Sequence, residues 1–431
     1  MVSFREALGY WVRLGFINFG GPAGQIAMMH RDLVDRRRWV SNGEFLRALN
    51  FCMVLPGPEA QQLATYIGWR LHGVLGGLMA GLWFILPSVF VLLGLSWLVA
   101  AHGDVAWVAG LLYGVQPVVV AIVVEAIMRI GRRTLHHWGL FLFAAAAFLA
   151  IYVFKAPFPL IVLTAAILGL VLSRWWPHVF GPREQTHSPG EETLSSSKAV
   201  AAFPPVSRAV AILAVFLVLW AVPVGALVLW RGVGSVHVQE ALFFTGAAFV
   251  TFGGAYSVLS YVAASAVSVY GWLGPDQMIQ GLALAESTPG PLIMVLQYVG
   301  FLGGWNFPGD LSPFLSGLLG ALTVTYVTFL PCFMFIFVGA PYVEALAGQQ
   351  RLQAAMTGIT AAVVGVILNL AVFFGGAVLF PERAGLDLFA LGLALAAFWV
   401  LWRWRWPIPG VVVGGAVLGM GWRLVGVPGL L

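Results

Sequence analysis

The amino-acid sequence predicts an all-α, polytopic membrane protein built from two related halves. Of its 431 residues, 60% are hydrophobic and only 9% are charged, whereas a soluble domain carries about 25% charged residues because its surface must be polar. Several apolar runs reach the roughly 20 residues that a membrane-spanning helix needs. The third observation is that a series of short motifs occurs twice along the chain in the same order.

This internal repeat predicts a duplicated architecture. Three pairs of motifs lie 233 positions apart: GFINFGG at 15–21 with AFVTFGG at 248–254, LPGP at 55–58 with TPGP at 288–291, and Trp39 with Trp272. An insertion near 305–316 changes the offset to 244, which then pairs Leu86-Pro87 with Leu330-Pro331 and Gly114 with Gly358. Chance does not produce such an ordered series, so we infer a duplication.

Hydropathy and helix-breaking residues divide the chain into apolar segments. The first half has them at about 7–30, 46–69, 74–100, 105–127, 138–154 and 157–173, and the second at about 239–262, 279–303, 312–339, 353–376, 386–402 and 408–425. We therefore expect a first repeat at residues 1–176, a polar linker at 177–206, one unpaired transmembrane helix at 207–230, and a second repeat at 231–431.

The positions of arginine and lysine predict the orientation, because these residues are enriched in cytoplasmic loops. We assume that the first two segments of each half are broken and re-enter the face from which they came. The amino terminus then shares one side with Arg31, Arg36, Arg37, Arg38, Arg70, Arg129, Arg132, Arg133, Arg174, Arg183, Lys198, Arg208, Arg351, Arg403 and Arg405. Only Lys155, Arg231, Arg383 and Arg423 fall on the other side.

This distribution predicts a membrane protein with a cytoplasmic amino terminus and linker and a carboxyl terminus on the opposite, periplasmic side. The single extra helix would invert the second half, and inverted repeats are common in secondary transporters. The net charge of +5 has the same origin in cytoplasmic loops, so we expect membrane lipids and no nucleic acid as partners.

Glycine and proline interrupt two apolar segments in each half. The breaks lie at Asn18–Pro22, Pro56–Glu59, Thr251–Gly254 and Glu286–Pro291. Proline ends one helix and suits the first turn of the next. A helix start presents unpaired N–H groups and about half a positive charge, so four starts would supply roughly +2. Such a site suits a tetrahedral dianion, although kinks that serve only packing are the alternative.

We expect the substrate-binding groups at these breaks. The backbone candidates are Gly20, Gly21, Pro56, Gly57, Pro58, Gly253, Gly254 and Gly290, and the polar side chains are Asn18, Asn50, Gln62, Thr251 and Thr288. Amides and hydroxyls are donors for oxyanion oxygens. Arg13, one to two turns before the first break, is either a direct counter-charge or an arginine that extends to the membrane interface.

Glu59, Glu125 and Glu286 are candidates for proton coupling, because an acid within an apolar segment commonly carries a proton or a cation. A charged carboxylate repels a dianion, so we expect Glu286 to be protonated when the anion is present and to release its proton elsewhere in the cycle. Glu59 lies in a helix first turn and can serve mainly as a cap. Glu125 can pair with Arg129 on the next turn.

The sequence offers no motif for an enzyme. It contains neither a phosphate-binding loop nor a zinc-protease motif or serine elbow. Its two cysteines, Cys52 and Cys332, have apolar neighbours and no metal-ligand spacing. We therefore expect a protein that is not an enzyme and has no cofactor and no metal.

At Phe19–Gly21, Leu55–Glu59, Gln62, Phe252–Gly254 and Glu286–Pro291 the sequence resembles the chromate transporter family in its long, two-domain form. The resemblance covers nearly the whole chain except the linker and the extra helix. It implies export of chromate across the bacterial inner membrane, driven by the membrane potential or the proton gradient, and hence chromate resistance.

Several alternatives stay open beside this resemblance. Sulfate has the same shape and charge as chromate, so a sulfate or oxyanion transporter or exchanger is the first alternative, and an anion channel is the second. A homodimer is also left open. The second half has Leu292 where the first has Glu59, so the two halves should not contribute identically.

Overall fold

The computed structural model describes residues 2–180, 205–343, 349–381 and 385–425, and these residues form helices and no β-strand. The first half comprises α1 Phe4–Ile17, α2 Gly21–His30, α3 Asn42–Val54, α4 Glu59–His102, α5 Ala106–Thr134, α6 Trp138–Tyr152, α7 Phe158–Leu172 and the short α8 Pro177–Phe180. After α9 Val206–Arg231, the second half comprises α10 Val236–Val250, α11 Ala255–Ala264, α12 Pro275–Ser287, α13 Val295–Asn306, α14 Pro313–Gly339, α16 Gln350–Leu379, α17 Leu388–Trp399 and α18 Ile408–Val425.

Among the described residues, six helices are long and apolar enough to cross a membrane: Glu59–His102, Ala106–Thr134, Val206–Arg231, Pro313–Tyr342, Gln350–Leu379 and Ile408–Val425. Their outward faces carry large apolar side chains, such as Leu217 and Leu229 on α9. Such a surface is stable in lipid, where no hydrophobic effect drives these side chains inward. The expectation of an all-α, multi-pass membrane protein is therefore confirmed.

The duplication is visible in the helix boundaries. Helix α3 begins at Asn42 and α12 at Pro275, so both ends of the pair differ by the offset of 233 found in the sequence. Helices α5 and α16 begin 244 positions apart, at Ala106 and Gln350. In both halves a π-helical turn follows the second helix, at Arg31–Arg36 and Ser265–Val269.

The first broken segment of each half forms a hairpin whose two ends meet. After the π-helical turn, Arg37 Nη1 lies 3.5 Å from Glu6 Oε1 near the start of α1. The rings of Tyr10 and Trp39 meet edge to face at 5.5 Å. At the matching place in the second half, Trp272 contacts Phe243 at 5.7 Å between ring centroids. Each segment thus returns to the level from which it started.

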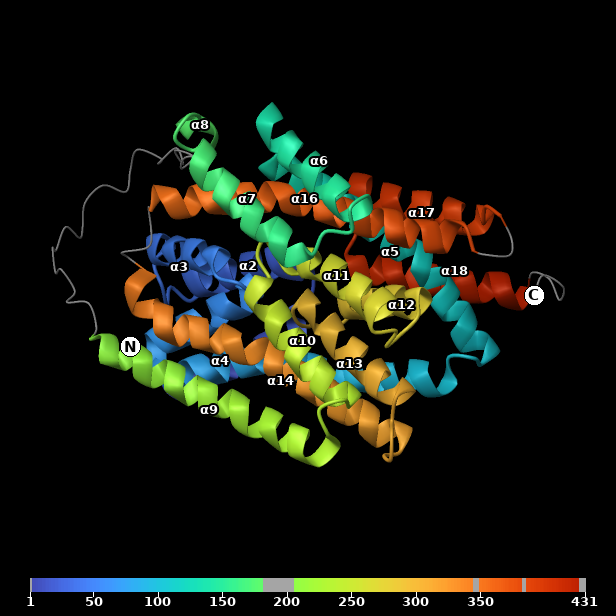
Figure 1. Cartoon of the computed structure of the whole chain (residues 1–431), viewed down its shortest axis with the longest axis horizontal. Coiled ribbons are helices and arrows are strands. Elements are labelled where there is room, and N and C mark those ends of the chain that lie inside the picture. The colour runs from blue at the N-terminus through green and yellow to red at the C-terminus, as the bar shows by residue number, and fades with distance from the viewer. Residues whose placement is uncertain (1, 181–204, 344–348, 382–384, 426–431) are drawn as a thin grey trace.

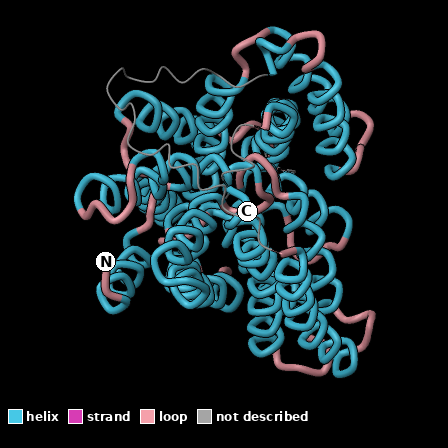
Figure 2. Tube along the Cα trace, turned by 90° about the vertical axis from the view of Figure 1, so that its left-hand side faces the viewer, coloured by secondary structure: helices cyan, strands magenta, loops and turns pink. Residues whose placement is uncertain are grey.

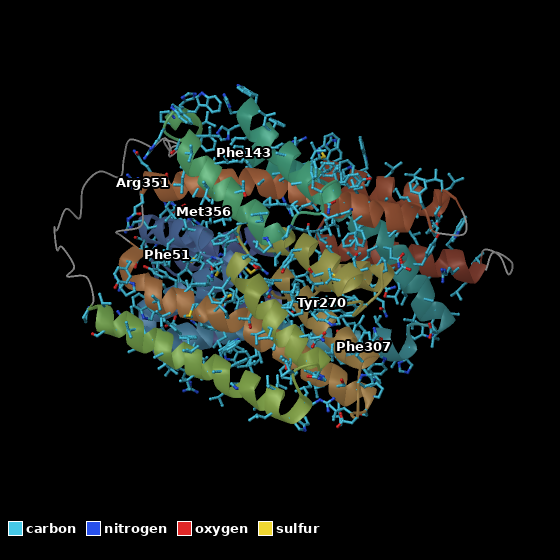
Figure 3. All side chains as sticks on the ribbon, in the orientation of Figure 1. Phe51, Phe143, Tyr270, Phe307, Arg351 and Met356 are labelled. Atoms are coloured by element: carbon cyan, nitrogen blue, oxygen red, sulfur yellow. The ribbon has the colours of Figure 1, made fainter. Side chains whose placement is uncertain are left out.

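The second broken segment behaves in the same way. The first part of α4 ends where His72 and Gly73 leave helical geometry, and just before this kink Arg70 Nε lies 2.8 Å from Glu44 Oε1 at the start of α3. In the second half, Asn306 Nδ2 at the end of α13 donates to Trp272 O over 2.8 Å. Helix α3, which belongs to a hairpin of the first half, lies at the left of Figure 1. Figure 3 shows Phe51 of α3 on the same side, whereas Phe307, which follows α13 of the second half, lies to the right.

The two halves exchange their last helices. Helix α18 of the second half packs on α5 of the first, where Gly114 approaches the backbone of Gly415 and Gly419. Helix α7 of the first half packs on α16 of the second, where Gly358 approaches Ala165 and Gly169. Small residues allow this close approach of two helices. Figure 2 shows the resulting bundle nearly end-on, with the described helices joined by loops.

The unpaired helix expected at 207–230 is α9, which runs along the lower edge of the bundle in Figure 1. Its Trp220 Nε1 donates to Thr245 Oγ1 of α10 over 2.9 Å. Most of the expected linker, residues 181–204, lies outside the described residues, as does Arg383. Arg183 and Lys198, two of the basic residues used to predict the orientation, lie within residues 181–204.

Candidate functional site

The breaks of one half meet the breaks of the other. Gly57 N, in the Pro-Gly-Pro loop of the first half, donates to Thr251 O at the second-half break over 2.8 Å. Gly290 N, in the second Pro-Gly-Pro loop, lies 3.4 Å from its acceptor, Asn18 O at the first-half break. The structure thus has two related junctions, which we name the Gly57 junction and the Gly290 junction after these donors.

Both loop glycines are required by backbone conformation and by space. Gly57 has φ +127° and Gly290 has φ +116°, a region that L side chains rarely adopt. A Cβ at Gly57 would lie 2.9 Å from Cys332 Sγ, and one at Gly290 would lie 2.8 Å from Ser88 Oγ. Ser88 and Cys332 directly follow the paired prolines of α4 and α14. Each loop therefore packs against the equivalent place in the opposite half.

The buried amide side chains hold these junctions together. Asn18 Nδ2 donates to Phe84 O over 3.0 Å and Gln62 Nε2 donates to Pro56 O over 2.8 Å. Gln25 Nε2, on α2, donates to both Asn18 O and Gly290 O over 2.7 Å. Three of the four acceptors, Asn18 O, Pro56 O and Gly290 O, lie at the breaks, where carbonyls lack a partner within a helix, whereas Phe84 O lies inside α4. Gln25 uses both N–H groups of its amide in this way, whereas Asn18 and Gln62 each use one and keep a second.

The two threonines at the second-half breaks also bond within the protein. Thr251 Oγ1 donates to Ala247 O over 2.7 Å, and Thr288 Oγ1 donates to Ala285 O over 3.2 Å. A hydroxyl has a single hydrogen, so neither group donates to an anion in this geometry. The donors that remain at the junctions are the second N–H of the Asn18 and Gln62 amides and the first backbone N–H groups of the helices that begin there, which have no partner within their own helix.

Two acids, the buried Glu286 and the partly buried Glu59, lie beside the same break. A Cβ built at Gly254 would lie 3.5 Å from Glu59 Oε1, and Glu59 Oε2 has no hydrogen-bond partner in the described part of the chain. Glu286, at the end of α12, accepts a hydrogen bond from the hydroxyl of Tyr256, two residues after Gly254. The Gly57 junction is thus the acidic one. The contacts of Gly290 at the other junction are with the neutral residues Asn18, Gln25 and Ser88.

The model of the chromate transporter family matches residues 6–170 and 238–420. The chain belongs to this family. Its two matched segments are the two halves, and the unmatched stretch between them contains the linker and α9. No solved structure matches the chain.

Curated relatives agree with this membership of the chromate transporter family. The chain is 32% identical to the "Chromate transport protein" of Pseudomonas aeruginosa over 434 residues, covering 98% of this chain and 92% of that protein. It is 29% identical to the "Probable chromate transport protein" of Synechococcus elongatus over 423 residues, covering 97% and 95%. The "Uncharacterized transporter YwrB" of Bacillus subtilis is 32% identical over 136 residues, which cover 32% of this chain and 69% of that protein.

Two other candidate residues of this chromate transporter family member lie apart from the junction contacts, whereas Glu125 and its partner Arg129 lie near Glu286 and Tyr256. Arg13 and Asn50 are exposed on α1 and α3. Glu125 pairs with Arg129 at 3.5 Å between Oε2 and Nη1, both partly exposed, which is the structural alternative considered from the sequence. Gln25 was missed by the sequence reasoning. Its signal was an amide in an apolar segment, one turn after a break.

Proposed function

We propose that this chain is a secondary transporter that exports chromate, a tetrahedral dianion, by binding it between the two halves and alternating access. The observation that carries the proposal is the reciprocal contact of the breaks, Gly57 with Thr251 and Gly290 with Asn18. Helix starts that converge near the bilayer midplane bind anionic groups in transporters made of discontinuous helices. The relatives named as chromate transport proteins supply the substrate in this proposal.

The proposed topology is a pair of inverted repeats with the amino terminus and linker in the cytoplasm of a bacterial cell. Its support is the grouping of basic residues near the hairpin ends of the first half, where Arg37 and Arg70 lie. Expelling an anion from a negative-inside cell is electrically downhill by about 2.3 kcal/mol per charge per 100 mV. The proposed export direction follows from this electrical driving force, and a role in chromate resistance follows from export.

Coupling to protons is proposed at the Gly57 junction. Glu59 and Glu286 lie beside the break at Thr251–Gly254, where a dianion would meet like charge if either acid were ionised. Glu286 is proposed to be neutral while the anion is bound and to lose its proton in another state. The hydroxyl of Tyr256 would then stabilise the ionised form of Glu286 when the anion has left.

Counterflow in proteoliposomes tests this function. Vesicles loaded with unlabelled chromate should accumulate labelled chromate transiently, and labelled sulfate in a parallel series measures the selectivity. Vesicles without protein are the control. Absence of chromate counterflow in folded protein would contradict the proposal, sulfate counterflow alone would reassign the substrate, and chromate currents far faster than a transport cycle would identify a channel.

A further inference from the structure

Glu240 is a fully buried carboxyl that the candidate site does not use. It lies on α10, about one turn after the helix begins at Val236. Its side chain has no exposed surface, and neither oxygen has a hydrogen-bond partner among the described residues. An ionised carboxylate without a partner is strongly disfavoured in a dry site. In this packed arrangement the group is therefore neutral and carries a proton.

The neighbouring helices make room for this carboxyl with glycine. A Cβ at Gly303 on α13 would overlap Oε1 of Glu240, and a Cβ at Gly320 on α14 would lie 2.9 Å from Oε2. Thus three helices, α10, α13 and α14, close around one carboxyl. In the first half the position 233 residues earlier is Ala7, which is buried. At this position the second half therefore has a buried carboxyl and the first half has none.

A histidine lies between Glu240 and the nearest end of α10. His237 is also fully buried and is three residues before Glu240, so the two side chains share one face of the helix. Its Nε2 lies 3.0 Å from Ser316 O and 3.1 Å from Ser316 Oγ. Its Nδ1 has no partner in the described chain. A group that can accept and donate a proton therefore stands next to the buried carboxyl.

Beyond His237 the chain reaches water. Arg231, at the end of α9, forms an ion pair with Asp310, whose side chain is 82% exposed. Arg231 Nη2 also donates to Pro308 O over 3.1 Å. This pair marks the aqueous face at the carboxyl end of α9, which is the periplasmic face in the proposed topology. The route from that face to Glu240 passes His237.

Tyrosines lie on three of the helices around α10. Tyr326 on α14 donates to Leu219 O of α9, and Tyr298 on α13 packs against Gly281 of α12, while its hydroxyl has no hydrogen-bond partner among the described residues. On α11, Tyr256 donates to Glu286 and Tyr261 stacks with Phe158. Within the described residues, the charged groups nearest to α10 on its neighbours are Arg231 and Asp310, which pair with each other. No ion pair involves Glu240.

We propose that Glu240 is a proton-binding site that is loaded through His237 from the face where α9 ends. The proton can leave only when water or a hydrogen-bond donor reaches the carboxylate of Glu240 and stabilises its charge. Such access requires α10 to move away from Gly303 and Gly320. Helix α10 continues to the break at Thr251, about 16 Å further along its axis at 1.5 Å per residue. Proton release at Glu240 is thereby linked to movement of the Gly57 junction, and this link rests on the proposed transport function.

Infrared titration of the whole protein in lipid vesicles without any anion tests the proton site directly. Wild-type protein should show the carbonyl stretch of a protonated carboxyl that is lost in Glu240→Gln. Glu44→Gln is the matched control, because Glu44 is paired with Arg70 and its removal should leave the band. If Glu240→Gln does not fold, Glu240→Met, which has a similar length, replaces it. Equal spectra of wild type and both Glu240 variants would overturn the proposal.

The route and the link to transport have separate readouts. His237→Phe should keep the Glu240 band but slow its hydrogen–deuterium exchange, and an unchanged exchange rate would overturn the route. In chromate transport at fixed membrane potential, Glu240→Gln should lose the dependence on pH at the α9 face. An unchanged pH dependence would overturn the link. Failure of wild-type protein to transport chromate would contradict the proposed function and leave the infrared result intact.

Discussion

Replacing Gly290 by alanine should weaken the contact between the second Pro-Gly-Pro loop and the first half. Gly290 has φ +116°, and a Cβ built there lies 2.6 Å from Ser88 Cβ. Two carbon atoms that are not bonded pack at about 3.5–4.0 Å. Helix α4, which carries Ser88, would therefore have to move away from the loop.

The expected loss has two parts. Holding alanine in this backbone conformation costs about 1–3 kcal/mol, and overpacking against Ser88 costs about 1–3 kcal/mol more. Even the lower sum of about 2 kcal/mol reduces the population of the packed junction about 30-fold. Ser88→Gly removes the contacting side-chain atoms. The double variant Gly290→Ala/Ser88→Gly should therefore recover the stability lost to overpacking but not the stability lost to backbone strain.

Thermal unfolding in detergent and chromate counterflow in proteoliposomes together measure these losses. Two glycines serve as matched controls. Gly271→Ala places a side chain at φ +63° with nothing within 4 Å of the Cβ, and Gly9→Ala adds a Cβ in open space with no such strain. We expect the loss of thermal stability and of counterflow to be smallest for Gly9→Ala, intermediate for Gly271→Ala and largest for Gly290→Ala. If Gly290→Ala equals Gly271→Ala and Ser88→Gly gives no rescue, the close approach at this junction is refuted.

Three further predictions concern coupling, packing and topology. Wild-type transport should fall as rising pH ionises Glu286, whereas Glu286→Gln should bind the anion and show a flatter profile at fixed membrane potential; Glu59→Gln should have the milder effect, and unchanged profiles in both variants would exclude proton coupling at these acids. Gly114→Leu and Gly358→Leu should each destabilise the exchanged helices by about 1–3 kcal/mol or more, while Gly94→Leu, with nothing within 4 Å of its Cβ, should be tolerated in thermal unfolding. Reporter fusions should place the linker in the cytoplasm and the carboxyl terminus in the periplasm, and a cytoplasmic carboxyl terminus would contradict the inverted repeats.

The helix breaks were predictable because glycine and proline act on the local backbone. The interruption expected at Asn18–Pro22 lies between α1 and α2, and the one expected at Thr251–Gly254 lies between α10 and α11. The pairing of the breaks across the halves was not predictable. The bond from Gly57 to Thr251 joins residues far apart in the chain, and no local propensity encodes that contact.

The roles of the polar side chains were also beyond the sequence. Asn18 and Gln62 are predicted donors to the anion, and in the structure each amide also donates one N–H to a backbone carbonyl. Carbonyls freed by a helix break must be satisfied at membrane depth, where little water is present. Glu240 escaped notice because it lies at the edge of an apolar segment, where an acid ordinarily faces water. Its burial comes from α13 and α14, whose packing the sequence does not reveal.

The location of bound chromate tests the central claim most directly. Crystals of the protein grown with chromate should give an anomalous difference peak for chromium beside the junctions, within hydrogen-bonding reach of the helix starts that follow Gly57, Gly254 or Gly290. A peak at Arg13 or on the surface, or no peak at a concentration that saturates transport, would contradict the account.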